Sequence, residues 1–136
     1  MLALLRAPGI GPARFGRLLE HFGSAGAALA ADRAEWDRLG LPAAALDYLR
    51  EPDWRGVERD LAWLERPGNR LLALDDSRYP PLLRQLVHPP PLLFVCGAVD
   101  SLRAPQLAIV GTRHPTPPGR ETARQFAAHL AGGGIA

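Results

Sequence analysis

The chain has 136 residues, of which 47% are apolar and 22% charged, a composition that is typical of a globular protein and excludes a disordered or fibrous one. The formal charge of +2 predicts no partner by itself, and no apolar run approaches the roughly 18 residues of a membrane span. Cys96 is the single cysteine, so no internal disulfide is possible. Residues 1–6 do not resemble a secretory leader, and both features lead us to expect a reducing, cytoplasmic location.

The first half of the chain, at about residues 1–68, predicts a compact all-helical unit with short connections. Apolar residues recur at helical spacing in five segments, and Gly23, Ser24 and Asp32 are of the types that end or begin helices. The expected helices are 15–22, 24–29, 32–39, 42–49 and 57–64, with Val57, Leu61 and Leu64 on one apolar face of the last.

Periodicity changes at residue 69, and residues 69–136 predict the opening β/α units of a Rossmann-like domain. Short apolar runs predict strands at 70–74 and 92–96, with a short helix at 82–87 between them. Cys96 ends the second run and is expected to be an inert core thiol.

A third strand is predicted at Leu107–Val110, where the run shows no alternation and is therefore typical of a strand buried in a parallel sheet. A helix from Arg120 to Leu130 should follow, with Ala123, Phe126, Ala127 and Leu130 turned inward, and residues 135–136 resemble the start of another strand. A doubly wound sheet needs more elements than these residues supply. We therefore expect the chain to be a fragment whose second domain is incomplete.

Charge is distributed unevenly between the halves, and all 16 basic residues are arginines. Residues 1–66 carry nine arginines and ten acidic residues, whereas residues 67–136 carry seven arginines and four acidic residues. The second half is therefore the better place to look for a polyanionic partner.

The loop between the predicted strand 107–110 and the following helix is the strongest candidate site. Ligands of open α/β sheets bind beyond the carboxyl ends of strands, and a helix N-terminus attracts phosphate. Glycines would allow close backbone approach, hydroxyls would donate, and arginines would make bidentate contacts. The candidate residues are Gly111, Thr112, Arg113, Thr116, Gly119 and Arg120. A plain βα turn with solvated arginines is the alternative.

A second, weaker candidate is the turn Pro8–Gly11 between two helices. The backbone N–H groups of Gly9 and Gly11 could hold a DNA phosphate, as in helix-hairpin-helix motifs, or the turn could simply connect packed helices. No histidine, cysteine or carboxylate cluster has the spacing of a zinc site, and no catalytic group or cofactor is predicted. Packing is the expected role of Trp36, Trp54 and Trp63.

Several blocks, taken in order and spacing, resemble the DNA-processing protein A family (DprA or Smf). They are LLALDDSRYPPLL at 71–83, PPLLFVCG at 90–97, AIVGTR at 108–113 and GRETA at 119–123. Residues 8–24 also resemble the helix-hairpin-helix or SAM-like N-terminal domain common in that family.

The resemblance implies a single-stranded DNA-binding protein that loads the RecA recombinase during natural transformation, acts as a homodimer and needs no enzymatic turnover. The family pocket would include Gly111, Thr112 and Arg113, with Thr116 and Gly119 from the following loop. Thr112 keeps the hydroxyl of the usual serine, whereas Pro118 replaces a common aromatic residue. The family's second glycine-rich motif would lie after residue 136.

Two other functions remain open from the residues alone. A Rossmann-like nucleotide phosphoribohydrolase also binds phosphates at glycine-rich helix starts, although Glu121 is the only acid near the loop. Alternatively, the helical unit could be a module that docks a protein partner.

Overall fold

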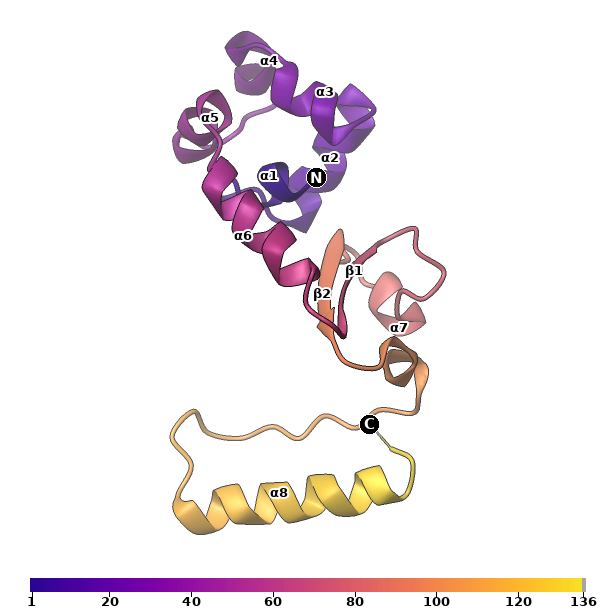
Figure 1. The fold of residues 1–136 in the computed structure, drawn as a ribbon. Coiled ribbons are helices and arrows are strands. Elements are labelled where there is room, and N and C mark those ends of the chain that lie inside the picture. Colours follow the sequence, from indigo (N-terminus) through magenta and orange to yellow (C-terminus); the bar gives the residue numbers. More distant parts are fainter. Residues whose placement is uncertain (136) are drawn as a thin grey trace.

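The computed structural model describes residues 1–135 as a helical unit, a two-stranded sheet with a short helix, and a long C-terminal helix (Figure 1). The helical unit contains α1 (Leu2–Leu5), α2 (Pro12–Phe22), α3 (Ala25–Ala30), α4 (Arg33–Arg38), α5 (Ala43–Arg50) and α6 (Trp54–Leu64). The remaining elements are β1 (Asn69–Ala73), α7 (Pro81–Arg84), β2 (Leu92–Cys96), the 3-10 helix η1 (Val99–Arg103) and α8 (Pro117–Gly132).

The predicted helix ends at Gly23, Ser24 and Asp32 are confirmed by their caps, whereas α2 and α6 each begin three residues before the predicted start. Gly23 ends α2 in the left-handed conformation, with φ of 76°, which a side chain would disfavour. The Ser24 hydroxyl accepts a hydrogen bond from the Ala27 N–H at 3.0 Å, and the Asp32 carboxylate accepts one from the Glu35 N–H at 2.9 Å. Each cap satisfies an N–H group that has no partner within its helix.

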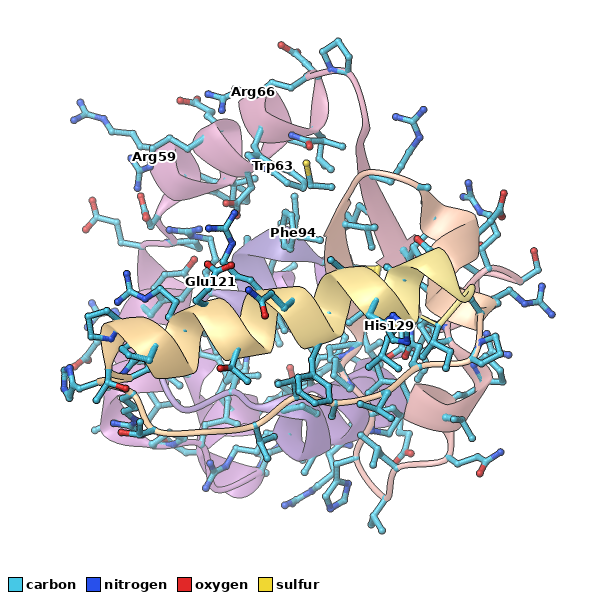
Figure 2. All side chains as sticks on the ribbon, turned by 90° about the horizontal axis from the view of Figure 1, so that it is seen from below. Arg59, Trp63, Arg66, Phe94, Glu121 and His129 are labelled. Atoms are coloured by element: carbon cyan, nitrogen blue, oxygen red, sulfur yellow. The ribbon has the colours of Figure 1, made fainter. Side chains whose placement is uncertain are left out.

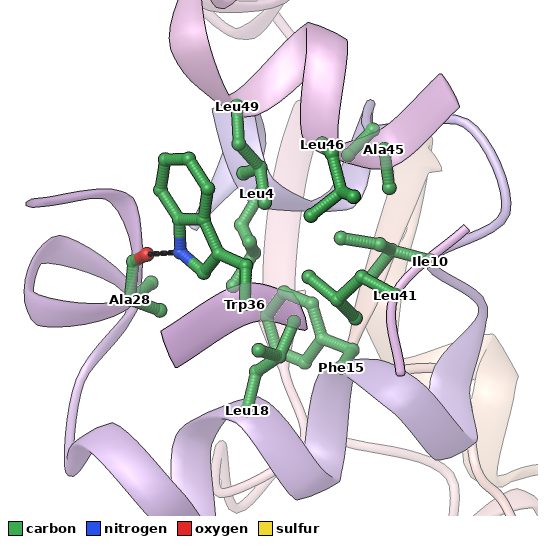
Figure 3. Packing of buried hydrophobic residues seen from close by; sticks show 12 residues of the cluster. Leu4, Ile10, Phe15, Leu18, Ala28, Trp36, Leu41, Ala45, Leu46 and Leu49 are labelled. Carbon is green, nitrogen blue, oxygen red and sulfur yellow. Dashed lines mark hydrogen bonds between the residues drawn. The ribbon is translucent and has the colours of Figure 1, made fainter. Parts of the chain in front are cut away.

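The main hydrophobic core lies among α1–α5 (Figure 3). Leu4, Phe15 and Leu18 are almost completely buried there, and Trp36 is 4% exposed. The Trp36 indole Nε1–H donates to the Ala28 carbonyl at 2.9 Å, so its polar atom is satisfied within the core. The prediction that Trp36 serves packing is confirmed.

Helix α6 attaches to this core differently from the prediction. Leu61, expected on the buried face, is 50% exposed, whereas Gly56 is buried. The side chains of Arg6 and Asp53 occupy the space where a Cβ of residue 56 would lie. An arginine–carboxylate cluster therefore takes the place of much of the expected apolar contact.

Strands β1 and β2 form an antiparallel pair in which Asn69 is opposite Cys96 and Ala73 is opposite Leu92. Both strands and the intervening short helix were predicted, and all three are present. Tyr79, 1% exposed, packs in the small core of this unit and donates its hydroxyl to the Pro90 carbonyl at 2.7 Å.

Three predictions for the second half are wrong within the described residues. Leu107–Val110 form no strand, and Val110 is 90% exposed, because no neighbouring strand is present to accept their hydrogen bonds. Cys96 is exposed rather than part of a core. Helix α8 is present but buries no residue, and Phe126, expected to face inward, is 61% exposed.

The sheet of residues 1–135 thus contains only an antiparallel pair, and parallel Rossmann-like pairing is not observed. The Ile135 N–H donates to the Leu130 carbonyl at 3.1 Å and extends the C-cap of α8. Ala136, the second residue of the strand expected at 135–136, lies outside the described residues. None of the helices in residues 1–135 combines the length and apolar character needed to cross a bilayer.

Candidate functional site

The six residues of the predicted site lie on the extended segment before α8 and on its first turn. The segment contains Gly111, Thr112 and Arg113. All six candidate residues are exposed to solvent. In Figure 1 this segment runs alongside α8 and away from the sheet, so an extended ligand can reach it without displacing a core element.

The start of α8 is closed by its own cap. Thr116 has extended backbone geometry, and its Oγ1 accepts a hydrogen bond from the Gly119 N–H at 3.3 Å. Pro117 and Pro118 occupy the first helical positions and have no N–H group. A phosphate at this terminus would therefore have to displace the long Thr116–Gly119 hydrogen bond, and fewer amides are available than the sequence suggested.

Gly119 has a specific steric role at this turn. A Cβ built on it would lie 3.2 Å from Thr116 Oγ1, a close approach for a side chain. By contrast, a Cβ at Gly111 would meet no atom within 4 Å, so the structure gives no steric reason for glycine there.

The two arginines remain the strongest anion-binding groups of this site. Neither Arg113 nor Arg120 forms an ion pair within residues 1–135. The N–H groups of Gly111, Thr112 and Arg113 also donate no backbone hydrogen bond within the described part of the chain. Guanidinium groups and unpaired amides in one loop are suited to phosphate oxygens.

Only part of the predicted constellation is held together by contacts. Thr116 and Gly119 are joined by the cap, and the Thr112 hydroxyl accepts from the His114 N–H at 3.3 Å. The side chains of Arg113 and Arg120 make no hydrogen bond or ion pair that would fix their positions within the described residues. The assignment of these residues to a binding site remains a prediction.

The second candidate, the turn at Gly9 and Gly11, has a clear packing role. Gly9 has φ of 76°, and a Cβ there would lie 2.9 Å from Pro42 Cγ. Arg14 donates from Nη1 to the Gly9 carbonyl at 2.8 Å, so its guanidinium is partly used to stabilise the turn. Gly11 is the N-cap of α2, and no atom lies within 4 Å of its built Cβ.

One surface was missed by the sequence reasoning. Arg55, Arg59 and Trp63 follow one another at spacings of four residues, which places them on one stripe of α6, and Arg66 follows three residues later, just past the C-cap Glu65. The four-residue spacing of these side chains is a signal that the sequence itself contains. No group of three or more His, Cys, Asp or Glu side chains in residues 1–135 is placed to hold a metal ion.

Both halves of the chain match known protein families. Residues 70–136 match the family model of DNA recombination-mediator protein A, and residues 1–31 match that of the DprA-like N-terminal HHH domain. The chain is 37% identical over 81 residues to protein Smf of Escherichia coli K12, and the aligned region covers 60% of this chain and 22% of that protein. It is 36% identical over 75 residues to protein Smf of Synechocystis, covering 52% and 19% respectively.

The chain thus spans about a fifth of the length of the curated relatives that it matches. Its architecture, a helical N-terminal unit followed by a small sheet and further helices, agrees with the order of the two matched regions. The chain belongs to the DprA/Smf family of DNA recombination-mediator proteins.

Proposed function

We propose that this chain contributes a single-stranded DNA-binding surface to a DNA-processing protein, with Arg113 and Arg120 as phosphate contacts. The protein as a whole would deliver bound DNA to the RecA recombinase in natural transformation, act as a homodimer and perform no catalytic turnover. Membership of a DNA recombination-mediator family supports this proposal. The observation that carries it is the pair of exposed arginines without ion-pair partners in the described residues.

Charge in the surrounding segment favours an anionic ligand. Residues 104–135 contain three arginines and one glutamate. Glu121 accepts a hydrogen bond from Gln125 at 3.1 Å and lies 3.7 Å from Arg124, so it leaves Arg113 and Arg120 unpaired. Contacts between these arginines and phosphates would position a strand without reading its sequence, and binding would weaken as salt increases.

The hydrolase alternative gains no support from the arrangement of carboxylates. Glycosidic cleavage would need a carboxylate poised at the phosphate site, whereas Glu121 is exposed and engaged by its helix neighbours. We therefore retain binding rather than catalysis as the proposed activity.

The test is a titration of a fluorescein-labelled oligo(dT) strand followed by anisotropy at two salt concentrations. Arg113→Ala and Arg120→Ala should each lower affinity about fivefold to tenfold and reduce the slope of log affinity against log salt by about 0.7. Arg33→Ala on α4 is the matched control, because it removes the same charge far from the loop in sequence. If both loop variants bind oligo(dT) with the affinity of the original chain at both salt concentrations, Arg113 and Arg120 do not belong to the site.

A further inference from the structure

Helix α6 carries a stripe of arginines that the loop site does not include. Arg55, Arg59 and Arg66 are exposed, and Arg66 lies one turn beyond Trp63, whose carbonyl accepts its N–H at 3.2 Å. Of the three guanidinium groups, Arg59 alone has an ion-pair partner in residues 1–135, namely Asp53 at 3.5 Å with both side chains well exposed. From Arg55 to Trp63 the stripe extends about 12 Å along the helix axis, and Arg66 lies just past the end of the helix.

An aromatic pair lies at the same stripe. Trp63 of α6 and Phe94 of β2 meet edge to face, with ring centroids 5.5 Å apart and planes at 69°. Phe94 is 43% exposed and Trp63 is half-buried, so the pair is accessible from solvent. Figure 2 shows Trp63 and Phe94 turned toward one another, with Arg59 on α6 and Arg66 just after that helix near the tryptophan.

The backbone positions of the two residues are fixed by ordered elements. The Asn69 side-chain amide donates to the Trp63 carbonyl at 2.6 Å, and Asn69 is 4% exposed at the start of β1. Phe94 is paired with Leu71 in the sheet register. Two aromatic rings on rigid elements lose little conformational freedom when a ligand binds.

The acidic residues of α6 lie beside this stripe. Glu58 and Glu65 occupy a neighbouring row of the helix, and Asp60 lies on the other side, where it accepts hydrogen bonds from Arg6. These carboxylates would repel a broad negatively charged surface such as a duplex. A single strand is narrow enough to follow the row of arginines between them.

We propose that the stripe of Arg55, Arg59 and Arg66 with the Trp63–Phe94 pair is a second contact surface for single-stranded DNA. The guanidinium groups take backbone phosphates, and the exposed aromatic rings stack on bases. Base–aromatic stacking tolerates any sequence, and its combination with a basic track is the general mode of sequence-independent single-strand binding. At about 3.4 Å for each stacked nucleotide, the helical part of the stripe accommodates about three or four nucleotides. This proposal rests on the proposed DNA-binding function and extends it to the helical unit.

Tryptophan fluorescence tests the aromatic part of the proposal. In a Trp54→Phe background, the remaining tryptophans are Trp63 and the buried Trp36. Addition of unlabelled oligo(dT) should quench the emission, and the quenching should disappear in the Trp54→Phe/Trp63→Leu variant. Trp63→Leu and Phe94→Leu should each weaken binding by at least about fivefold in anisotropy.

The arginines are tested by a triple variant, Arg55→Gln/Arg59→Gln/Arg66→Gln. Three lost phosphate contacts should lower the salt slope by about 2. The matched control is Arg33→Gln/Arg38→Gln/Arg50→Gln, which makes the same change of charge on α4 and α5. Because the stripe arginines are exposed, this variant tests the proposal even if Trp63→Leu disturbs folding, which circular dichroism would reveal.

The outcomes separate this inference from the loop site. The stripe proposal alone is overturned if binding depends on Arg113 and Arg120, is equal in the stripe triple variant and its control, and leaves Trp63 emission unchanged. The same result is expected if the stripe docks a protein. An absence of any oligo(dT) binding overturns both proposals. A preference for duplex over single-stranded DNA in the stripe-dependent binding would contradict the argument from the flanking carboxylates.

Discussion

Arg6 of α1 donates two hydrogen bonds through Nη1 to the carboxylate oxygens of Asp60 on α6, at 3.1 and 2.9 Å. Its Nη2 lies 3.4 Å from Asp53 Oδ2, and the Asp53 carboxylate also caps α6 by accepting from the Gly56 N–H at 2.8 Å. This N–H bond, followed by the nearby Arg59 and Arg6 guanidinium groups, lowers the pKa of Asp53. The first and last helices of the helical unit are therefore joined by one charged cluster.

Replacing Arg6 by alanine should destabilise the chain by about 1 kcal/mol, because half-exposed ion pairs are screened by water even when hydrogen-bonded. Urea denaturation followed by circular dichroism measures the change. Arg33→Ala removes a more exposed pair with Asp37 and should change stability by less than about 0.5 kcal/mol. Equal effects of the two variants would show that the Arg6 cluster is no more than ordinary surface charge.

Trp36→Phe should destabilise the helical unit by about 2 kcal/mol, since it leaves the Ala28 carbonyl without its buried donor and reduces core volume. Trp54→Phe is the matched control, because Trp54 is 56% exposed and should tolerate the change. The same denaturation experiment compares them. A Trp36 variant as stable as the Trp54 variant would contradict the assigned role of the indole N–H.

The two glycines of the α1–α2 turn should respond differently to alanine. Gly9→Ala forces a side chain into a left-handed backbone and against Pro42, and should cost about 1 to 2 kcal/mol of stability. Gly11→Ala meets open space and should cost less than about 1 kcal/mol. Thermal unfolding gives the stabilities. Oligo(dT) anisotropy, measured at a temperature where the variants and the original chain are all folded, tests Gly11 as a phosphate contact. Weaker binding by a stable Gly11→Ala chain would favour the phosphate role.

Protonation of Asp76 should lower the stability of the chain in acid. The Arg78 side chain, followed by the Arg78 backbone N–H, lowers the pKa of Asp76 from 3.8 to about 2. Since the folded-state pKa is below the unfolded value, the stabilisation is complete above about pH 4 and is lost as pH falls toward 2. Urea midpoints measured from pH 5 to pH 2 should fall less steeply in Asp76→Asn than in the original chain. Parallel curves would show that this ion pair does not contribute.

The helical unit was largely predictable because its information is local. Gly23, Ser24 and Asp32 each mark a helix end through bonds made within a few residues, and the structure places each cap as expected. The strands at β1 and β2 and the helix α7 were predictable for the same reason, from short apolar runs separated by prolines.

The candidate site was only partly predictable. The sequence located Arg113 in the loop and Arg120 at the start of the following helix, but the Thr116–Gly119 cap and the two prolines determine which amides remain at the start of α8. Leu107–Val110 show the limit of local patterns, because an apolar run becomes a strand only where another strand accepts its hydrogen bonds. The arginine spacing along α6 is present in the sequence, whereas the contact between Trp63 and Phe94 exists only in the folded chain.

By itself, the sequence determined the helix ends at Gly23, Ser24 and Asp32, the positions of two strands and the blocks that resemble one family, since caps, turns and motifs depend on neighbouring residues. Only the tertiary structure decided that Gly56 is buried against Arg6, that Cys96 and Phe126 are exposed, and that Trp63 meets Phe94. These facts depend on contacts between residues far apart in the chain, and burial follows from which surfaces meet rather than from hydrophobicity alone.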